Sequence, residues 1–180
     1  MEHIGTKTIE TERLILRRFK LTDAKDMFNN YTSHALVTEY LTWYPHKTLE
    51  DTQQYLSQIV LPEYEKPDTY KWAIVWKENG QVIGSIDVVE SIERKQRAEL
   101  GWVIGEEYWG KGIMPEAARE VVKYLFNVGY ERVQAIHDVA NKKSGRVMEK
   151  VGMKHEGTLL KYNPNRDNVL IDCDMWAITK

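Results

Sequence analysis

The stretch Glu107–Ala117, EYWGKGIMPEA, combines residue types that suit anion binding. Gly110 and Gly112 flank Lys111, and Pro115 follows at a position where a helix would begin. The first N–H groups of a helix have no partner within the helix and point outward with the positive end of the helix dipole. Glycines let the backbone approach a ligand closely, and a lysine adds positive charge. The stretch therefore predicts either a phosphate-binding loop or a plain turn between a strand and a helix.

Two known phosphate-binding patterns do not fit this loop. The segment Gly105–Gly112, GEEYWGKG, follows G-x-x-x-x-G-K-[ST] except at its last position, where glycine replaces the hydroxyl that would hold magnesium. The dinucleotide pattern G-x-G-x-x-G fails because Pro115 occupies the place of the third glycine. What remains is a metal-free anion site built from main-chain N–H groups, with an ordinary turn as the alternative.

The elements around the loop are predicted from periodicity and from turn and capping signals. Alternating apolar segments joined by Asn79-Gly80 predict a meander before the loop, and an apolar stripe at helical spacing predicts a helix after it. Strands are expected over 13–19, 71–77, 82–89, 98–104 and 133–137, with two more near the end of the chain. Further helices are expected from Thr22, from a Thr48–Asp51 capping box to Pro62, and over 144–151 before Gly152. The order of these elements predicts a mixed α+β domain with one parallel crossover.

Composition limits the class of protein. A chain of 180 residues, 42% hydrophobic and 29% charged, fits one domain over 1–180 with a core of about 10–178. A net charge of −2 offers no basic face for nucleic acid, and no apolar run has the length of a signal peptide or a membrane span. The single Cys173 indicates a reducing compartment, so we expect a cytoplasmic protein. The histidines and this cysteine lack the spacing of metal ligands, so no metal site is expected.

Four segments, in order, resemble the GNAT superfamily of N-acetyltransferases, and in particular its branch of ribosomal-protein N-terminal acetyltransferases. They are TERLILRRFKLTDAKDMF, AELGWVIGEEYWGKG, EYWGKGIMPEA and ANKKSGRVMEKVGMKHEGTL, and with the strands between them the resemblance extends over 12–178. It implies a GNAT-like acyl-CoA N-acyltransferase fold, with a mixed, mostly antiparallel seven-stranded sheet flanked by about four helices. It also implies acetyl-CoA as the donor, a primary amine as the acceptor, and direct attack in a ternary complex.

The resemblance places coenzyme A on the glycine loop and on the strand before it. The implied cofactor-binding residues are Trp102, Val103, Ile104, Trp109, Gly110, Lys111, Gly112, Ile113, Met114, Asn141 and Ser144. A backbone N–H of the 102–104 segment would polarise the thioester carbonyl. Asn141 would bind the pantetheine arm and Ser144 would lie near the sulfur, with helix capping as the alternative for both.

Three positions depart from the family pattern. Trp109 stands in place of its Gln or Arg, and Met114 in place of its final Gly or Ala, as is typical of this branch. Met148 stands where many GNAT enzymes have a tyrosine that protonates the leaving thiolate. A thioether cannot donate a proton, so Ser144 or water is the expected acid. The missing tyrosine also leaves open a second interpretation, a CoA-binding sensor domain without catalysis.

The acceptor is predicted from the ease of deprotonating an amine. An α-amino group has a pKa of about 7.7–8.0 and a lysine side chain about 10.4, so an α-amine needs only a modest base. Glu99 is the candidate base, with an ion pair to Arg97 or to another surface cation as the alternative, and Trp43 and Tyr44 are expected to line the acceptor side. We predict acetylation of a protein N-terminal α-amine, with a small-molecule amine such as a polyamine or an antibiotic as the alternative. An exposed strand edge would allow a homodimer.

Overall fold

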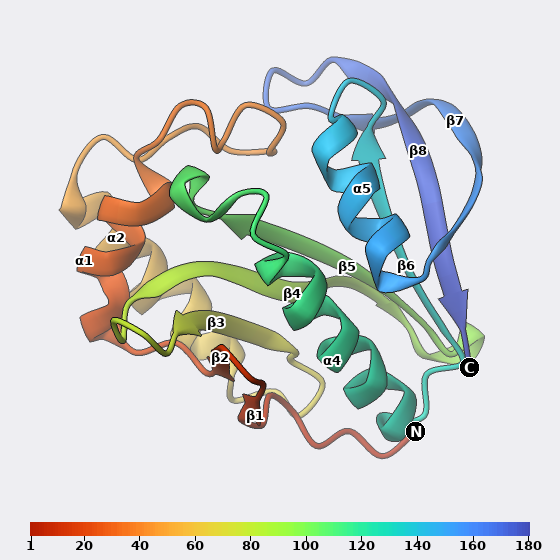
Figure 1. Cartoon of the computed structure of the whole chain (residues 1–180), viewed down its shortest axis with the longest axis horizontal. Coiled ribbons are helices and arrows are strands. Elements are labelled where there is room, and N and C mark those ends of the chain that lie inside the picture. Colours follow the sequence, from red (N-terminus) through yellow and green to blue (C-terminus); the bar gives the residue numbers. More distant parts are fainter.

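In the computed structural model, which describes residues 1–180, eight strands form one sheet in the order β1-β2-β3-β4-β5-β6-β8-β7 (Figure 1). Every neighbouring pair is antiparallel except β5 and β6, which are parallel. The strands are β1 (Ile9–Glu10), β2 (Leu14–Arg17), β3 (Lys71–Trp76), β4 (Val82–Ile92), β5 (Arg97–Ile104), β6 (Arg132–Asp138), β7 (Lys154–Pro164) and β8 (Leu170–Thr179). The helix between β5 and β6 makes the one parallel crossover that the sequence predicts.

Four helical segments flank the sheet. The first joins η1 (Leu21–Asp23), α1 (Ala24–Met27) and the π-turn η2 (Phe28–Thr32), and the second joins α2 (Leu49–Tyr55), the π-turn η3 (Leu56–Val60) and α3 (Leu61–Glu63). The other two are α4 (Ile113–Val128) and α5 (Lys142–Val151), and single 3-10 turns form η4 (Glu93–Lys95) and η5 (Glu106–Tyr108). No helix is both long enough and apolar enough to cross a membrane.

Each face of the sheet packs against its own pair of helical segments. The larger core, with 23 buried residues, joins α4 and α5 to one face through side chains such as Val121, Leu125 and Met148. A smaller core of 10 buried residues joins α1 and the α2–η3 segment to the other face through Met27 and Leu56. Helical periodicity in α4 and alternation in the strands therefore place both cores.

The α+β class and the mostly antiparallel sheet with about four helices are confirmed, and two details of the prediction are wrong. The sheet has eight strands and not seven, because the two-residue β1 pairs with β2 at Ile9–Leu16 and Glu10–Ile15. Pro62 does not end its helical segment, which continues to Glu63. The π-turn η3 lets Pro62 enter the first turn of α3, where its missing N–H leaves no hydrogen bond unmade.

Candidate active site

The glycine loop presents its main-chain N–H groups without partners. Gly110 and Gly112 both have left-handed backbone, with φ of +74° and +73°. This conformation favours glycine and turns the chain into α4, whose N-cap is Gly112. The N–H groups of residues 110–114 donate to no acceptor within the protein. They open at the N-terminal end of a 16-residue helix, where the helix dipole favours negative charge.

A carboxylate behind the loop fixes its geometry. Glu116, in the first turn of α4, accepts hydrogen bonds from the Thr11 hydroxyl at 2.6 Å, the Arg13 backbone N–H at 3.0 Å and Arg13 Nε at 2.7 Å. Arg13 Nη1 also donates to the Lys111 carbonyl at 3.0 Å. Burial raises the pKa of Glu116, but the hydrogen bonds from Thr11 and Arg13 outweigh it, so the pKa is lowered overall. The carboxylate thus stays ionised and ties the turn between β1 and β2 to the start of α4.

A gap opens beside the loop because the two parallel strands separate. β5 and β6 pair only at Arg97–Arg132, Ala98–Val133 and Glu99–Gln134, although both strands continue beyond these residues.

The polar groups of β5 along this gap follow from strand alternation. Gly105 N–H donates to Ile83 O in β4, so alternation turns the N–H groups of Trp102 and Ile104 toward the gap. The Ile104 carbonyl is occupied, since the Trp109 indole Nε1 donates to it at 2.9 Å. The Trp102 and Ile104 N–H groups are therefore the ones that could meet a ligand in the gap.

Two cavities meet at this gap. One, of about 660 Å³, is lined by the glycine loop, the start of α4 and one side of α5, and we call it the loop cavity. The other, of about 1040 Å³, lies against β3, β4, β5 and the helical segments on the opposite side, and we call it the floor cavity. Six residues line both: Tyr40, Leu41, Trp102, Val103, Asn141 and Ser144. Ligands bound in the two cavities would therefore touch at the point where β5 and β6 diverge.

Asn141 and Ser144 lie at this junction and also cap α5. The Asn141 side-chain oxygen accepts from Ser144 N–H at 3.4 Å, and Asn141 Nδ2 donates to the Ser144 hydroxyl oxygen at 3.1 Å. The capping alternative is thus correct, and both side chains also line both cavities. Met148, one turn further along α5, is buried and lines only the floor cavity.

Glu99 faces the floor cavity from β5 and is buried, with 8% of its surface exposed. Its carboxylate accepts a hydrogen bond from Gln134 Nε2 in β6 at 2.7 Å. Burial raises the pKa of Glu99 above its usual value, and the Gln134 hydrogen bond works against that rise. The alternative ion pair is not formed, because Arg97 pairs with Glu90. A carboxylate with a raised pKa that lines the floor cavity, three residues before Trp102 at the junction, is suited to act as a general base.

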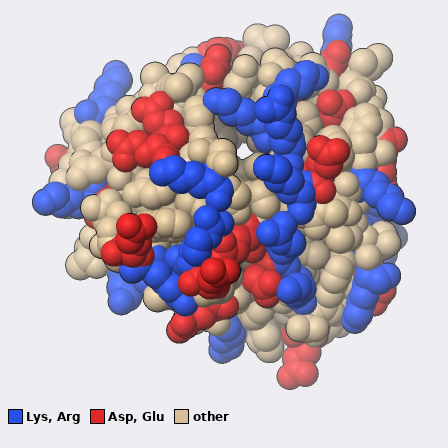
Figure 2. All heavy atoms as spheres, viewed as in Figure 1, with Lys and Arg blue, Asp and Glu red and all other residues tan.

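A row of cations borders the loop cavity. α5 contributes four basic side chains, Lys142, Lys143, Arg146 and Lys150, and none of them forms an ion pair. Figure 2 shows blue side chains gathered around a hollow beside α5. Lys143 Nζ lies 3.7 Å from the centroid of the Trp109 ring across this cavity. In a chain of net charge −2, such a row favours a ligand with several negative charges.

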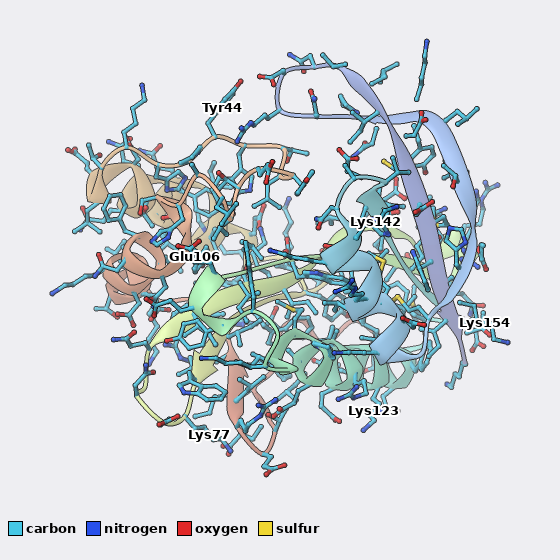
Figure 3. All side chains as sticks on the ribbon, turned by 45° about the horizontal axis from the view of Figure 1, so that its top comes forward. Tyr44, Lys77, Glu106, Lys123, Lys142 and Lys154 are labelled. Atoms are coloured by element: carbon cyan, nitrogen blue, oxygen red, sulfur yellow. The ribbon has the colours of Figure 1, made fainter.

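The structure separates the other predicted site residues. Trp43 lines the floor cavity. Tyr44 does not: it is 57% exposed, on the outer side of the loop between η2 and α2 (Figure 3), where its hydroxyl donates to Asp167 and Arg166 stacks on its ring. The Lys111 side chain likewise lies outside the loop cavity, beside the Tyr108 ring. Neither side chain is therefore placed to meet a ligand in the cavities. The other predicted residues of the loop and of β5 do line the loop cavity.

The sequence pattern of the family described as Acetyltransferase (GNAT) domain matches residues 13–154. The chain belongs to the GNAT family. Over 175 residues it is 30% identical to the uncharacterized N-acetyltransferase YoaA of Bacillus subtilis, and the match covers 96% of each chain. A GNAT-family acetyltransferase of Bacillus anthracis has a similar solved structure, with a TM-score of 0.82 and 28% identity, covering 96% of this chain and 98% of the other.

Two partial matches to named GNAT enzymes differ in their acceptors. The candidate ribosomal N-acetyltransferase YdaF of Bacillus subtilis is 34% identical over 80 residues, covering 44% of each chain. The spermidine N(1)-acetyltransferase of Escherichia coli K12 is 32% identical over 83 residues, covering 46% of this chain and 45% of the other. The chain is thus a GNAT N-acetyltransferase, and these relatives do not agree on an acceptor.

Sequence reasoning missed three polar residues of this GNAT enzyme. Gln134 bonds to Glu99, Glu116 holds the loop, and Asp87 lies on the floor cavity. For Asp87 and Gln134 a signal was present, because each is a polar residue inside an apolar strand, in VIGSIDVV and VQAIH. Buried polar side chains need partners, so a polar residue within a buried strand deserves a place among site candidates. No group of histidine, cysteine or acidic side chains is arranged to hold a metal ion.

Proposed function

We propose that this chain transfers the acetyl group of acetyl-CoA to a primary amine bound in the floor cavity, by direct attack in a ternary complex. The observation that carries the proposal is the connection of two unlike sites. The unpartnered N–H groups of 110–114 open into a cavity bordered by cations, and this cavity meets a second one that the buried carboxylate of Glu99 lines. A donor with phosphates and an acceptor with an amine fit these two sites respectively.

The loop cavity suits coenzyme A in its charges and in its shape. The pyrophosphate would accept from the main-chain N–H groups of Gly110 to Met114, and the α5 cations would offset the remaining phosphate charge. The pantetheine arm would extend along the gap between β5 and β6, with Asn141 beside it. The thioester would then lie at the junction of the cavities, where the Trp102 and Ile104 N–H groups are available to its carbonyl oxygen.

The reaction follows from the groups at the junction. The neutral amine attacks the thioester carbonyl carbon, and the oxyanion that forms is stabilised by an N–H group of β5. Glu99 takes the proton from the attacking nitrogen, directly or through one water, and Gln134 holds its carboxylate in place. The intermediate then breaks its carbon–sulfur bond. The leaving thiolate takes a proton from Ser144 or from water, since the Met148 thioether has none to give.

A protein N-terminal α-amine is the acceptor that we propose first. Its pKa lies about 2.6 units below that of a lysine side chain, which makes deprotonation about 3.5 kcal/mol easier at neutral pH. A single buried carboxylate is a sufficient base for such a group. The second candidate is a small cationic amine, because four acidic side chains line the floor cavity, Asp87, Glu90, Glu99 and Asp138, against one lysine, Lys71. The partial relatives include one enzyme named for each acceptor class.

The test is release of coenzyme A. The purified protein is incubated with acetyl-CoA and a panel of N-terminal peptides, polyamines and aminoglycosides, and free thiol is measured with a thiol reagent while mass spectrometry identifies the product. We expect one acceptor class to release CoA well above the rate without amine, and Glu99→Gln to abolish this excess. CoA binding by calorimetry with no release for any amine would instead support the sensor interpretation and overturn the proposal.

A further inference from the structure

A partly buried cluster of charges beside the floor cavity takes no part in the proposed reaction. Lys71 in β3 pairs directly with Asp87 in β4, and Asp87 pairs with Gly101 in β5, so the three residues form one row across the sheet. Lys71 Nζ lies 2.8 Å from Glu63 Oε2 and 3.8 Å from Asp87 Oδ2. Lys71 and Asp87 both line the floor cavity, with 15% and 22% of their side chains exposed.

This cluster is not neutral. One lysine serves two carboxylates, so one negative charge is left without a partner when all three groups are ionised. Lys71 lies closer to Glu63, so the negative charge of Asp87 is the one that is less well compensated. Burial raises the pKa of Asp87 to about 6, and the attraction of Lys71 offsets this rise only in part. A partly buried carboxylate without a matching cation is costly unless a ligand supplies the charge.

A second polar group on the same cavity, the Tyr31 hydroxyl, has no hydrogen-bond partner. Tyr31 is 2% exposed, and its hydroxyl forms no hydrogen bond within the chain. The charge of Asp87 contributes to the rise in the pKa of Tyr31, so the two side chains lie in one neighbourhood. A carboxylate that shares its one lysine with Glu63 and a hydroxyl without a hydrogen bond line the same cavity, and both point to a polar ligand group there.

The position of Asp87 relative to Glu99 defines the spacing of such a ligand. Asp87 lies opposite Gly101, and Glu99 is two residues from Gly101 on the same strand, so both carboxylates project from the same face of the sheet. Diagonal neighbours of this kind are about 7–8 Å apart. Gly101 has no side chain to fill the space between them, and a Cβ there would lie 2.7 Å from Val89 Cγ1.

We propose that Asp87 binds a second positive charge on the acceptor, so that this enzyme prefers acceptors with two cationic groups. The proposal rests on the amine site of the proposed function. The reacting nitrogen must lose its charge to attack, so it cannot remain the partner of Asp87, whereas a second ammonium or guanidinium stays charged throughout. A chain of about four or five methylene groups separates two nitrogens by roughly the 7–8 Å that separates the backbone positions of diagonal neighbours. The acceptor class is therefore a diamine, or an N-terminal peptide whose next residue is basic.

Binding of two matched amines tests this proposal without catalysis. Pentane-1,5-diamine and pentylamine share the reacting amine and the carbon chain, and differ only in the second charge. Calorimetry at pH 7.5 measures each on the intact protein, with and without saturating coenzyme A, so that turnover plays no part. We expect the diamine to bind about tenfold or more tightly than the monoamine, the effect of one charge-assisted contact. Equal affinities in the wild-type protein would overturn the proposal.

Three variants should change the preference for the diamine over the monoamine in directions that the cluster predicts. Asp87→Asn should bind the two amines equally. Glu63→Gln should also weaken the preference, although Glu63 does not line the cavity, because Lys71 is then free to neutralise Asp87. Lys71→Gln should keep or increase the preference, because it removes the competing cation. Glu120→Gln, at an ion pair with Lys123 on α4, is the control and should leave the preference unchanged. A diamine preference that survives in Asp87→Asn would refute the assignment, and Glu63→Gln decides the matter if Asp87→Asn does not fold.

Rates of acetylation show whether the second positive charge belongs to a diamine or to a peptide. They also distinguish failure of the Asp87 proposal from failure of the acetyltransferase proposal. Acetylation of pentane-1,5-diamine over pentylamine would support a diamine, and acetylation of Ala-Lys amide over Ala-Gln amide would support an N-terminus followed by a basic residue. If both substrates of each pair are acetylated at equal kcat/KM, the role of Asp87 is refuted while the acetyltransferase proposal stands. If none is acetylated but the binding preference holds, the acetyltransferase proposal is the one that fails.

Discussion

Replacing Gly110 by alanine tests whether the glycine loop is a ligand site and not only a turn. Gly110 has φ of +74°, and no atom lies within 4 Å of the position that a Cβ would occupy. An alanine there would meet no clash within the chain, so its intrinsic cost is that of left-handed backbone, about 1–2 kcal/mol. Gly80, in the turn between β3 and β4, has φ of +71° and equally open surroundings. Gly80→Ala is therefore a control with the same backbone strain at a residue that lines neither cavity.

The same backbone strain should affect a different measured quantity in each variant, the free energy of unfolding in one and the Kd of coenzyme A in the other. The ladder between β3 and β4 fixes the backbone at Gly80, so the cost falls on the free energy of unfolding. Around Gly110, the N–H groups of 110–114 bond to nothing within the protein, and the contact of Arg13 with the Lys111 carbonyl lies on an exposed side chain, so residue 110 of the variant can relax when no ligand is bound. Binding of coenzyme A then requires the left-handed backbone again. A cost of about 1–2 kcal/mol at that step corresponds to a Kd raised about 5- to 30-fold.

Calorimetry with coenzyme A and urea denaturation measure the two quantities. For Gly110→Ala we expect a Kd raised about 5- to 30-fold and little change in the free energy of unfolding. For Gly80→Ala we expect a free energy of unfolding lowered by about 1–2 kcal/mol and an unchanged Kd. A methyl group that also touches the bound phosphate would raise the Kd of Gly110→Ala further. If that variant binds coenzyme A within about twofold of the wild type, the loop is only a turn and the argument for an anion site is refuted.

Three further substitutions test the base and the anchor of the loop. Glu99→Gln should lower kcat about 100-fold or more while the Kd of coenzyme A stays constant, and an unchanged kcat would place the base elsewhere. Gln134→Leu removes the hydrogen bond that works against the raised pKa of Glu99, so the base ionises only at higher pH. The rising limb of the pH–rate profile should then move to higher pH, and a limb that does not move would contradict the role of Glu99. Glu116→Gln should lower the free energy of unfolding by about 1–2 kcal/mol at pH 7. Because the folded-state pKa of Glu116 is lowered from 4.5, this difference should be full above that pH and shrink as the pH falls through the lowered pKa. A difference that is independent of pH would show that the ionised form contributes nothing.

The parts of the fold that the sequence predicts well are those set by local signals. The capping box at Thr48 and Asp51 forms as expected, with Thr48 accepting from the Asp51 N–H at 3.2 Å. Gly152 ends α5 in left-handed backbone, and Asn79-Gly80 turns the chain between β3 and β4. Each of these depends on residues within one turn of each other, so their types determine the outcome. The same holds for the glycine loop, whose conformation is set by its own two glycines.

The parts that could not be predicted depend on which strands become neighbours. The partner of Glu99 is Gln134, 35 residues away, and it is fixed only once β5 and β6 pair in parallel over three residues. Arg97, two residues from Glu99, was the closer candidate in sequence, but it pairs with Glu90. A bulge places Glu90 opposite Glu99, because the register of β4 and β5 shifts between Val88 and Glu90. Bulges of one residue leave no clear mark in an apolar strand, so this shift could not be read from the sequence. The homodimer stays a prediction, with β1 and β7 as the exposed edges of the sheet.

The most informative property of this molecule is a separation of charge that its composition conceals. Helical spacing gathers Lys143, Arg146 and Lys150 on one side of α5, and the alternation of the strands gathers Asp87 and Glu99 on one face of β4 and β5. The chain as a whole has 25 basic and 27 acidic side chains, so the charges of the two sets are hidden in a net charge of −2, which suggests no preference for ligands of either sign. In space they do not cancel, because they border different cavities that share only six lining residues. An anionic donor and a cationic acceptor would each be attracted to its own entrance and repelled from the other. Two substrates could then be bound at once without competing for one site, which is the condition that direct transfer in a ternary complex requires.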